Sequence, residues 1–93
     1  MFVVTVLFWI KPDDAARFET AMLENARLSL ANEPGCRQFD VCKGQDGQIF
    51  LYEAYDTAQA FEDHKATSHF LEFDSKTAPW VAHKEVWIYE KLF

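Results

Sequence analysis

The most constraining feature of this sequence is an apolar run at its start, from Phe2 to Ile10. The run is rich in β-branched and aromatic residues, and it lacks the polar alternation of a strand that has one face in water. A strand of this kind needs cover on both of its faces. The run therefore predicts a sheet with helices against one side and further apolar cover on the other.

The next segment has the pattern of an amphipathic helix. Pro12 and the acids that follow it are typical of a helix start, and Glu33-Pro34-Gly35 is typical of a helix end. Between them an apolar stripe recurs at every fourth position, and it consists of Phe18, Met22, Ala26 and Leu30. We expect this stripe to face the sheet.

The remaining segments predict three strands and a second, broken helix. Strands are expected over residues 36–43 and 48–55, joined by a hairpin turn at 44–47 that contains an Asp-Gly pair. A capping pattern from Asp56 to Gln59 predicts a helix through about Lys65. Thr67 and Ser68 restart a short helix over about 69–76, and the last strand is expected over 81–93.

The order of these elements is β-α-β-β-α-β, a split βαβ arrangement. The chain of 93 residues has the length of one domain, spanning 1–93. We therefore predict an α+β, ferredoxin-like fold with an antiparallel sheet.

The amount of apolar surface predicts a second copy of the chain as partner. The composition is 49% hydrophobic and 16% aromatic, whereas a chain of this size buries only roughly 60–65% of its unfolded surface. Two helices cover one sheet face, and the other face would expose a large apolar patch. Its expected members are Val3, Leu7, Trp9, Phe50, Tyr52, Trp87 and Tyr89. We predict a homodimer that buries this face.

The charge argues against several other partners. The net charge is −6, and the few basic residues are scattered, which is unlike a nucleic-acid-binding surface. The apolar run from Phe2 is about half as long as a membrane span and lacks the features of a signal peptide. We expect a cytoplasmic protein without a membrane partner. Cys36 and Cys42 lie on one predicted strand, roughly 20 Å apart, and are expected to be free thiols.

Two histidines lie at the predicted helix break, His64 and His69. Imidazole titrates near neutrality, so the pair could supply a general acid and a general base. The alternative is a pair of exposed histidines at helix ends. We expect no bound metal, because a spacing of five in a helix does not place both rings on one face and no further ligand lies nearby.

Further candidates come from one strand and one helix face. Glu53 lies in the middle of a strand between apolar neighbours, where a carboxylate is costly unless it is paired or functional. Its structural alternative is an ion pair with Lys84 or Arg37. Asn25 and Ser29 share a helix face and could project into a pocket, although exposed positions are the simpler interpretation. Some of the many aromatic residues, Phe39 among them, could line a pocket for a flat ligand.

Four segments together resemble the antibiotic biosynthesis monooxygenase domain family, whose members are small dimeric α+β barrels. They are the apolar first strand, Glu33-Pro34-Gly35-Cys36, the stretch from Phe50 to Asp56, and the stretch from Phe61 to Phe70. The last of these contains His64-Lys65-Ala66-Thr67-Ser68-His69-Phe70, which is similar to the H-x-x-T-x-H-[FY] pattern of quinol monooxygenases.

The resemblance implies a monooxygenase that needs no metal, flavin or haem. In this branch the deprotonated quinol-like or polyketide-like aromatic substrate itself donates an electron to O₂. The site then needs a base and an apolar cavity. The implied catalytic residues are His64, His69 and Glu53, and the implied substrate contacts are Asn25, Phe39, Tyr55 and Lys65.

Three alternatives remain open within this resemblance. An isomerase of phosphorylated autoinducer-2 shares the Tyr52-Glu53-Ala54-Tyr55 and His64-to-His69 patterns closely, with Lys65 as the candidate phosphate contact. A haem-degrading enzyme fits poorly, because His64 stands where that branch has a pocket tryptophan and Asp74 near where it has its axial histidine. A dimeric barrel that binds a small molecule without turnover is the non-enzymatic alternative.

Overall fold

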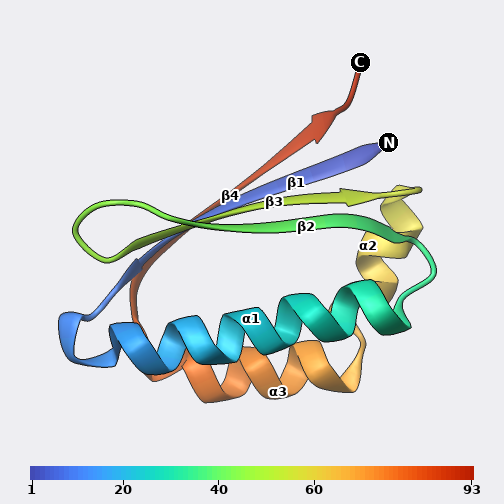
Figure 1. The fold of residues 1–93 in the computed structure, drawn as a ribbon. Coiled ribbons are helices and arrows are strands. Elements are labelled where there is room, and N and C mark those ends of the chain that lie inside the picture. Colours follow the sequence, from blue (N-terminus) through green and yellow to red (C-terminus); the bar gives the residue numbers. More distant parts are fainter.

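The apolar first strand lies in the interior of the sheet. In the computed structural model, which describes residues 1–93, β1 (Phe2–Ile10) pairs antiparallel with β3 (Gln48–Tyr55) and β4 (Val81–Glu90) on its two sides. The strand β2 (Cys36–Lys43) completes the order β2-β3-β1-β4 (Figure 1). This antiparallel, ferredoxin-like α+β arrangement confirms the predicted fold class.

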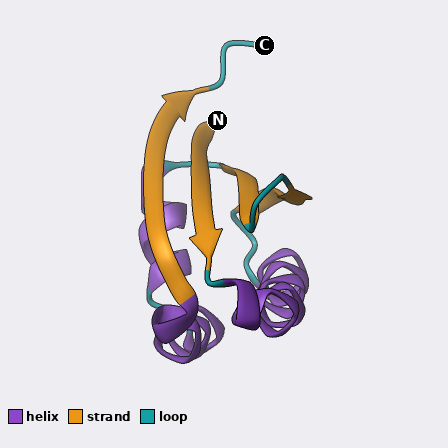
Figure 2. Ribbon diagram, turned by 90° about the vertical axis from the view of Figure 1, so that its left-hand side faces the viewer, coloured by secondary structure: helices purple, strands orange, loops and turns teal.

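The helices lie against one face of this sheet. After a short 3₁₀ turn (Pro12–Asp14), α1 (Ala15–Asn32) runs alongside α3 (Ser68–Thr77), and α2 (Ala58–Lys65) lies at one end of the sheet (Figures 1 and 2). A second 3₁₀ turn (Ala78–Trp80) leads into β4. None of the helices is long and apolar enough to cross a membrane.

The cap of α2 differs from the predicted one by one residue. Thr57 caps the helix, because its side chain accepts a hydrogen bond from the backbone N–H of Ala60 at 3.1 Å. The carboxylate of Asp56 instead pairs with the guanidinium of Arg37 at 2.8 Å. The helix therefore begins at Ala58, one residue later than a cap at Asp56 would place it.

The predicted stripe of α1 is wrong at its C-terminal end. Phe18, Met22 and Ala26 are buried, but Leu30 is 48% exposed. A repeat of four residues advances 400° around the axis, so each step moves about 40° away from the original face. Asn25 and Ser29 take the buried position instead, at 4% and 0% exposure, so their interpretation as exposed residues is also wrong.

One core joins the helices to the sheet. A tilted aromatic contact connects Phe8 to Phe18 and an edge-on contact connects Phe18 to Phe73, with ring centroids 5.1 and 5.7 Å apart. The buried members of this core are Val4, Val6, Phe8, Ile10, Phe18, Met22, Ala26, Cys36, Phe39, Ile49, Leu51, Tyr55 and Phe73. Cys36 and Cys42 are free thiols, as predicted.

The sheet face opposite the helices is apolar and exposed in the single chain. The register places Thr5 between Tyr52 and Trp87, and Leu7 between Phe50 and Glu85. We call this surface the open sheet face, and its large members are Leu7, Trp9, Phe50, Tyr52, Trp87 and Tyr89. Val3, which was expected among them, is buried at 3% exposure. Trp87 and Tyr89 are 55% and 53% exposed. The last strand ends at Glu90, three residues before the predicted end.

Candidate functional site

The break between α2 and α3 brings two imidazoles together. Thr67 caps α3 by accepting a hydrogen bond from the backbone N–H of Phe70, and its hydroxyl donates to the carbonyl oxygen of His64 at 2.7 Å. His64 lies in the last turn of α2 and His69 in the first turn of α3. The tight turn between them lets both side chains reach one carboxylate.

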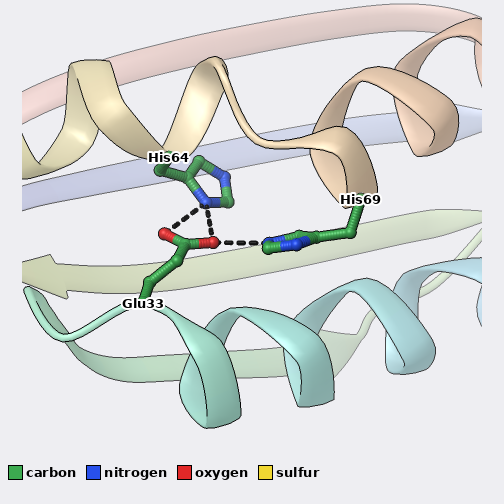
Figure 3. Close-up of side chains that lie close together, drawn as sticks. All are labelled: Glu33, His64 and His69. Carbon is green, nitrogen blue, oxygen red and sulfur yellow. Dashed lines mark hydrogen bonds and ion pairs between the residues drawn. The ribbon is translucent and has the colours of Figure 1, made fainter.

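That carboxylate belongs to Glu33, the residue that ends α1. Nδ1 of His64 lies 2.9 Å from both carboxylate oxygens, and Nε2 of His69 lies 2.5 Å from Oε2 (Figure 3). The side chains of Glu33, His64 and His69 are 9%, 3% and 12% exposed. We call these three residues the Glu33–His64–His69 cluster.

Two expectations from the sequence are corrected by this cluster. The histidines are not ordinary exposed residues at helix ends, because both are held by a nearly buried carboxylate. The argument that a spacing of five keeps the rings apart is also wrong, since the two histidines lie on separate helices. Glu33 was interpreted only as part of a helix-ending turn, and its site role is visible only once the fold is known.

A cavity of about 440 Å³ lies between the sheet and the helices, and the cluster borders it through His64. Most of its wall is apolar and aromatic, with contributions from all four strands and all three helices. Five of the residues that the sequence suggested for a site line this cavity: Asn25, Phe39, Glu53, His64 and Lys65.

The other two suggested residues lie behind the cavity wall. His69 faces a separate groove between α1 and α3, and Glu33 links it to His64 at the cavity wall. Tyr55 is fully buried and does not line the cavity. Its hydroxyl donates a hydrogen bond to Glu53 at 2.5 Å, so its role is to hold that carboxyl group.

Glu53 is a buried carboxyl group without an ion pair. Arg37 pairs with Asp56, and Lys84 forms no salt bridge with Glu53, so the ion pair considered from the sequence is absent. Burial raises the pKa of Glu53 to about 7. The hydrogen bond from Tyr55 and the positive charge of Lys84 oppose this shift, and the negative charge of Glu33 adds to it. The group can therefore hold or release a proton near neutral pH.

The environment of His64 suits a base. Burial lowers the pKa of His64 below its ordinary value, and the hydrogen bond to Glu33 partly opposes that effect. The Glu33 carboxylate favours the tautomer that carries its proton on Nδ1. Nε2 makes no hydrogen bond within the chain, although His64 lines the cavity. A neutral imidazole with a free Nε2 can accept a proton from a bound ligand.

Asn25 offers a second contact for a ligand. Its Oδ1 is a buried side-chain acceptor without any hydrogen-bond partner, and the residue lines the cavity. An unpartnered buried polar group costs about 1–3 kcal/mol, so such groups are rare unless a ligand or water satisfies them. The cavity thus presents an amide, a carboxyl group and an imidazole within an otherwise apolar wall.

Comparison with known proteins decides the family. The family model for antibiotic biosynthesis monooxygenases matches residues 1–76. The chain belongs to this family. A Nitrosomonas europaea structure provisionally named as a monooxygenase of the same family is 33% identical, covers 100% of both chains and superimposes with a TM-score of 0.94.

Two further relatives of the antibiotic biosynthesis monooxygenase family are more distant. Rv0793 of Mycobacterium tuberculosis, provisionally named a monooxygenase, is 28% identical over 71 residues, which are 75% of this chain and 69% of Rv0793. A Caulobacter crescentus structure is 24% identical, covers 99% of this chain and 90% of its own, and has a TM-score of 0.94. The Caulobacter crescentus structure shows that the two chains share a fold.

The raised pKa of Glu53 predicts a specific pH dependence of stability. Its pKa is about 7 in the folded state and 4.5 as an ordinary glutamate, so the unfolded chain loses this proton first as pH rises. The contribution of Glu53 to stability is therefore present below pH 4.5 and is lost as pH rises through 7. Glu53→Gln keeps the acceptor for Tyr55 without the charge.

We expect Glu53→Gln to be more stable than the natural chain at pH 8 by up to about 3 kcal/mol, and this difference should shrink toward pH 5. Urea unfolding of both proteins across this pH range measures the difference. A stability difference that is the same at pH 5 and pH 8 would contradict the raised pKa.

Proposed function

We propose that this chain is a cofactor-independent monooxygenase that acts on a quinol-like or polyketide-like aromatic substrate. The observation that carries the proposal is the Glu33–His64 pair at the wall of an apolar cavity of about 440 Å³. This volume lies within the range of small-molecule sites and suits a flat molecule of one or a few rings. Family membership supports the reaction class.

The first step assigned to the protein is removal of a phenolic proton by Nε2 of His64. The positive charge that forms on the ring is stabilised by Glu33, which already contacts Nδ1 at 2.9 Å. The electron-rich phenolate then donates an electron to O₂. For a simple quinol, the overall reaction converts quinol and O₂ to hydroxyquinone and water. One atom of the O₂ enters each product.

The remaining residues of the cavity orient the substrate. Phe39 contributes to the aromatic wall, and the Asn25 amide and the Glu53 carboxyl group offer hydrogen bonds to hydroxyl or carbonyl oxygens of a quinol. Buried polar groups that need partners discriminate strongly between ligands that supply them and ligands that do not. We therefore propose that the substrate carries at least two oxygen substituents.

The isomerase alternative has a weaker basis in the cavity. Lys65 and Lys84 both line the cavity and are the available phosphate contacts. Lys65 is already paired with Glu62 at 3.1 Å, and Glu62 and Asp74 also belong to the cavity wall. Acids beside a phosphate would repel it. An aromatic ligand without a phosphate fits this wall better.

Oxygen consumption tests the proposal. We expect the purified chain to consume O₂ with a set of mono- and dihydroxylated aromatic compounds and to leave a phosphorylated hydroxyketone unchanged. Turnover of the phosphorylated compound without O₂ uptake would support the isomerase instead. Binding of aromatic compounds in calorimetry without any O₂ uptake would identify a non-catalytic binding protein.

We also propose that the chain works as a homodimer through the open sheet face. Leu7, Phe50 and Trp87 lie on that face, and covering them removes a patch larger than single chains usually expose. Specific interfaces bury at least roughly 1,000 Å² in total, and a four-stranded sheet face can supply that area.

A further inference from the structure

We propose that the Glu33–His64–His69 cluster binds a divalent first-row transition ion, with Zn²⁺ as its simplest representative. A bound ion and a working base are then alternative states of the same three side chains. The binding itself does not depend on the function proposed above, because it follows from the donor atoms alone.

The donor set is the first argument. One carboxylate oxygen and one nitrogen from each of the two imidazoles lie within 4.8 Å of one another. Two histidines and one carboxylate form a ligand set that zinc and other divalent transition metals use in catalytic sites, where further positions stay open. The donors come from α1, α2 and α3, so the fold holds them from three directions (Figure 3).

The distances are close to those that an ion needs. Around a tetrahedral ion with bonds of about 2.1 Å, neighbouring donor atoms lie roughly 3.4 Å apart. The corresponding separations are 2.9 Å from Nδ1 of His64 to Glu33 and 2.5 Å from Nε2 of His69 to Glu33. The two separations from Glu33 must therefore widen by less than about 1 Å, which side-chain rotations can provide, and the two imidazole nitrogens lie within 4.8 Å of each other. Ser29 Oγ lies 3.3 Å from Nε2 of His69, beside the same centre.

The ion can reach the cluster from the protein surface beside Glu33. This residue also lines a surface groove, together with Asp56, Asp63 and Thr67. Asp56 is paired with Arg37, but Asp63 and the net charge of −6 favour the approach of a cation. Entry from this side does not require passage through the apolar cavity.

Coordination changes the proton state of His64. Nδ1 must lose its proton to bind an ion, and the neutral ring then carries its remaining proton on Nε2. An Nε2–H group donates a hydrogen bond and cannot accept a proton from a ligand in the cavity. The ring keeps one proton, which now sits on Nε2, and the bound ion therefore blocks the base.

Equilibrium titration of the metal-free chain with Zn²⁺, and with Co²⁺ as a coloured probe, tests the proposal without any substrate. We expect one ion per chain and an affinity that falls at acidic pH, where protons compete with the ion for the donor atoms. Glu33→Gln and His69→Asn should each weaken binding at least about tenfold, since even outer-sphere changes at metal sites have effects of roughly 10–100-fold.

His83→Asn is the matched control. His83 lies 3.2 Å from Glu85 on the exposed part of β4, so it is also a histidine beside a glutamate but lacks a third donor. This variant should bind the ion as the natural chain does. Equal affinity in Glu33→Gln, His69→Asn and the natural chain would overturn the proposal, and so would the absence of binding to the natural chain. Because oxygen uptake is not measured, this failure is distinct from a failure of the proposed monooxygenase activity.

Discussion

Replacing His64 by asparagine is expected to lower the turnover number by roughly 10²–10⁴-fold, the usual contribution of a positioned general base. The asparagine amide can still donate a hydrogen bond to Glu33 from about the position of Nδ1, but it offers no basic nitrogen to the cavity. The loss should therefore appear in turnover, with a small change in stability. Steady-state oxygen uptake and thermal unfolding measure the two quantities.

The choice of asparagine follows from the packing of His64. The ring is 2% exposed and lies among aromatic neighbours, with its centroid 5.0 Å from that of Phe70 and 5.5 Å from that of Tyr55. Alanine would leave a void and an unpaired buried carboxylate, so it would lower stability as well as activity. His83→Asn is the control at an exposed site. If His64→Asn keeps more than about a tenth of the activity, His64 is not the general base.

Replacing Trp87 by glutamate is expected to separate the proposed homodimer. Trp87 is 55% exposed on β4, an edge strand of the open sheet face, beside Thr5, and a charge there would be buried against the proposed partner chain. Loss of an anchoring interface tryptophan costs about 2–4 kcal/mol, which corresponds to roughly 30–1,000-fold weaker association. Sedimentation should give twice the 10.8 kDa chain mass for the natural protein at micromolar concentration and the single mass for the variant.

Leu71→Glu provides the matched control for this experiment. Leu71 is 54% exposed but lies on α3, on the helical side of the sheet. The same change of charge there should leave the dimer intact. A natural chain that sediments as a monomer, or a Leu71→Glu variant that dissociates as readily as Trp87→Glu, would show that the open sheet face is not the interface.

The fold was predictable because each element carries its own local pattern. The Asp-Gly pair at residues 46–47 marks the hairpin, and the apolar run from Phe2 marks a strand that lies between two others. The errors occur where local pattern and helix geometry diverge. Leu30 continues the repeat of four residues, but by that point the repeat has rotated away from the buried face of the helix. Asn25 and Ser29 are polar, and they are nevertheless buried on that face.

The candidate site was predictable in part. His64, Glu53 and Asn25 were chosen by residue type and position, and the structure brings all three to one cavity. Glu33 was missed, because a glutamate before Pro34 and Gly35 has a sufficient explanation as the end of a helix. Its partner His64 is 31 residues away in the sequence, and no local pattern encodes that contact.

The spacing of His64 and His69 in the sequence also failed to predict how close the two side chains lie. The sequence spacing of His64 and His69 was judged as if both lay on one helix, but the chain turns at Thr67 between them. A contact between two helices and the end of a third is a property of the packed chain. Short-range spacing rules therefore fail at this place.

The central claim is that this chain inserts one atom of O₂ into an aromatic substrate without a cofactor. The most direct test is the reaction of the metal-free chain with a quinol under ¹⁸O₂, followed by mass measurement of the product. We predict a hydroxylated quinone that carries one ¹⁸O atom, with the second atom released as water, and we predict its loss in His64→Asn. A product without ¹⁸O, or no product while the quinol binds, would contradict the account.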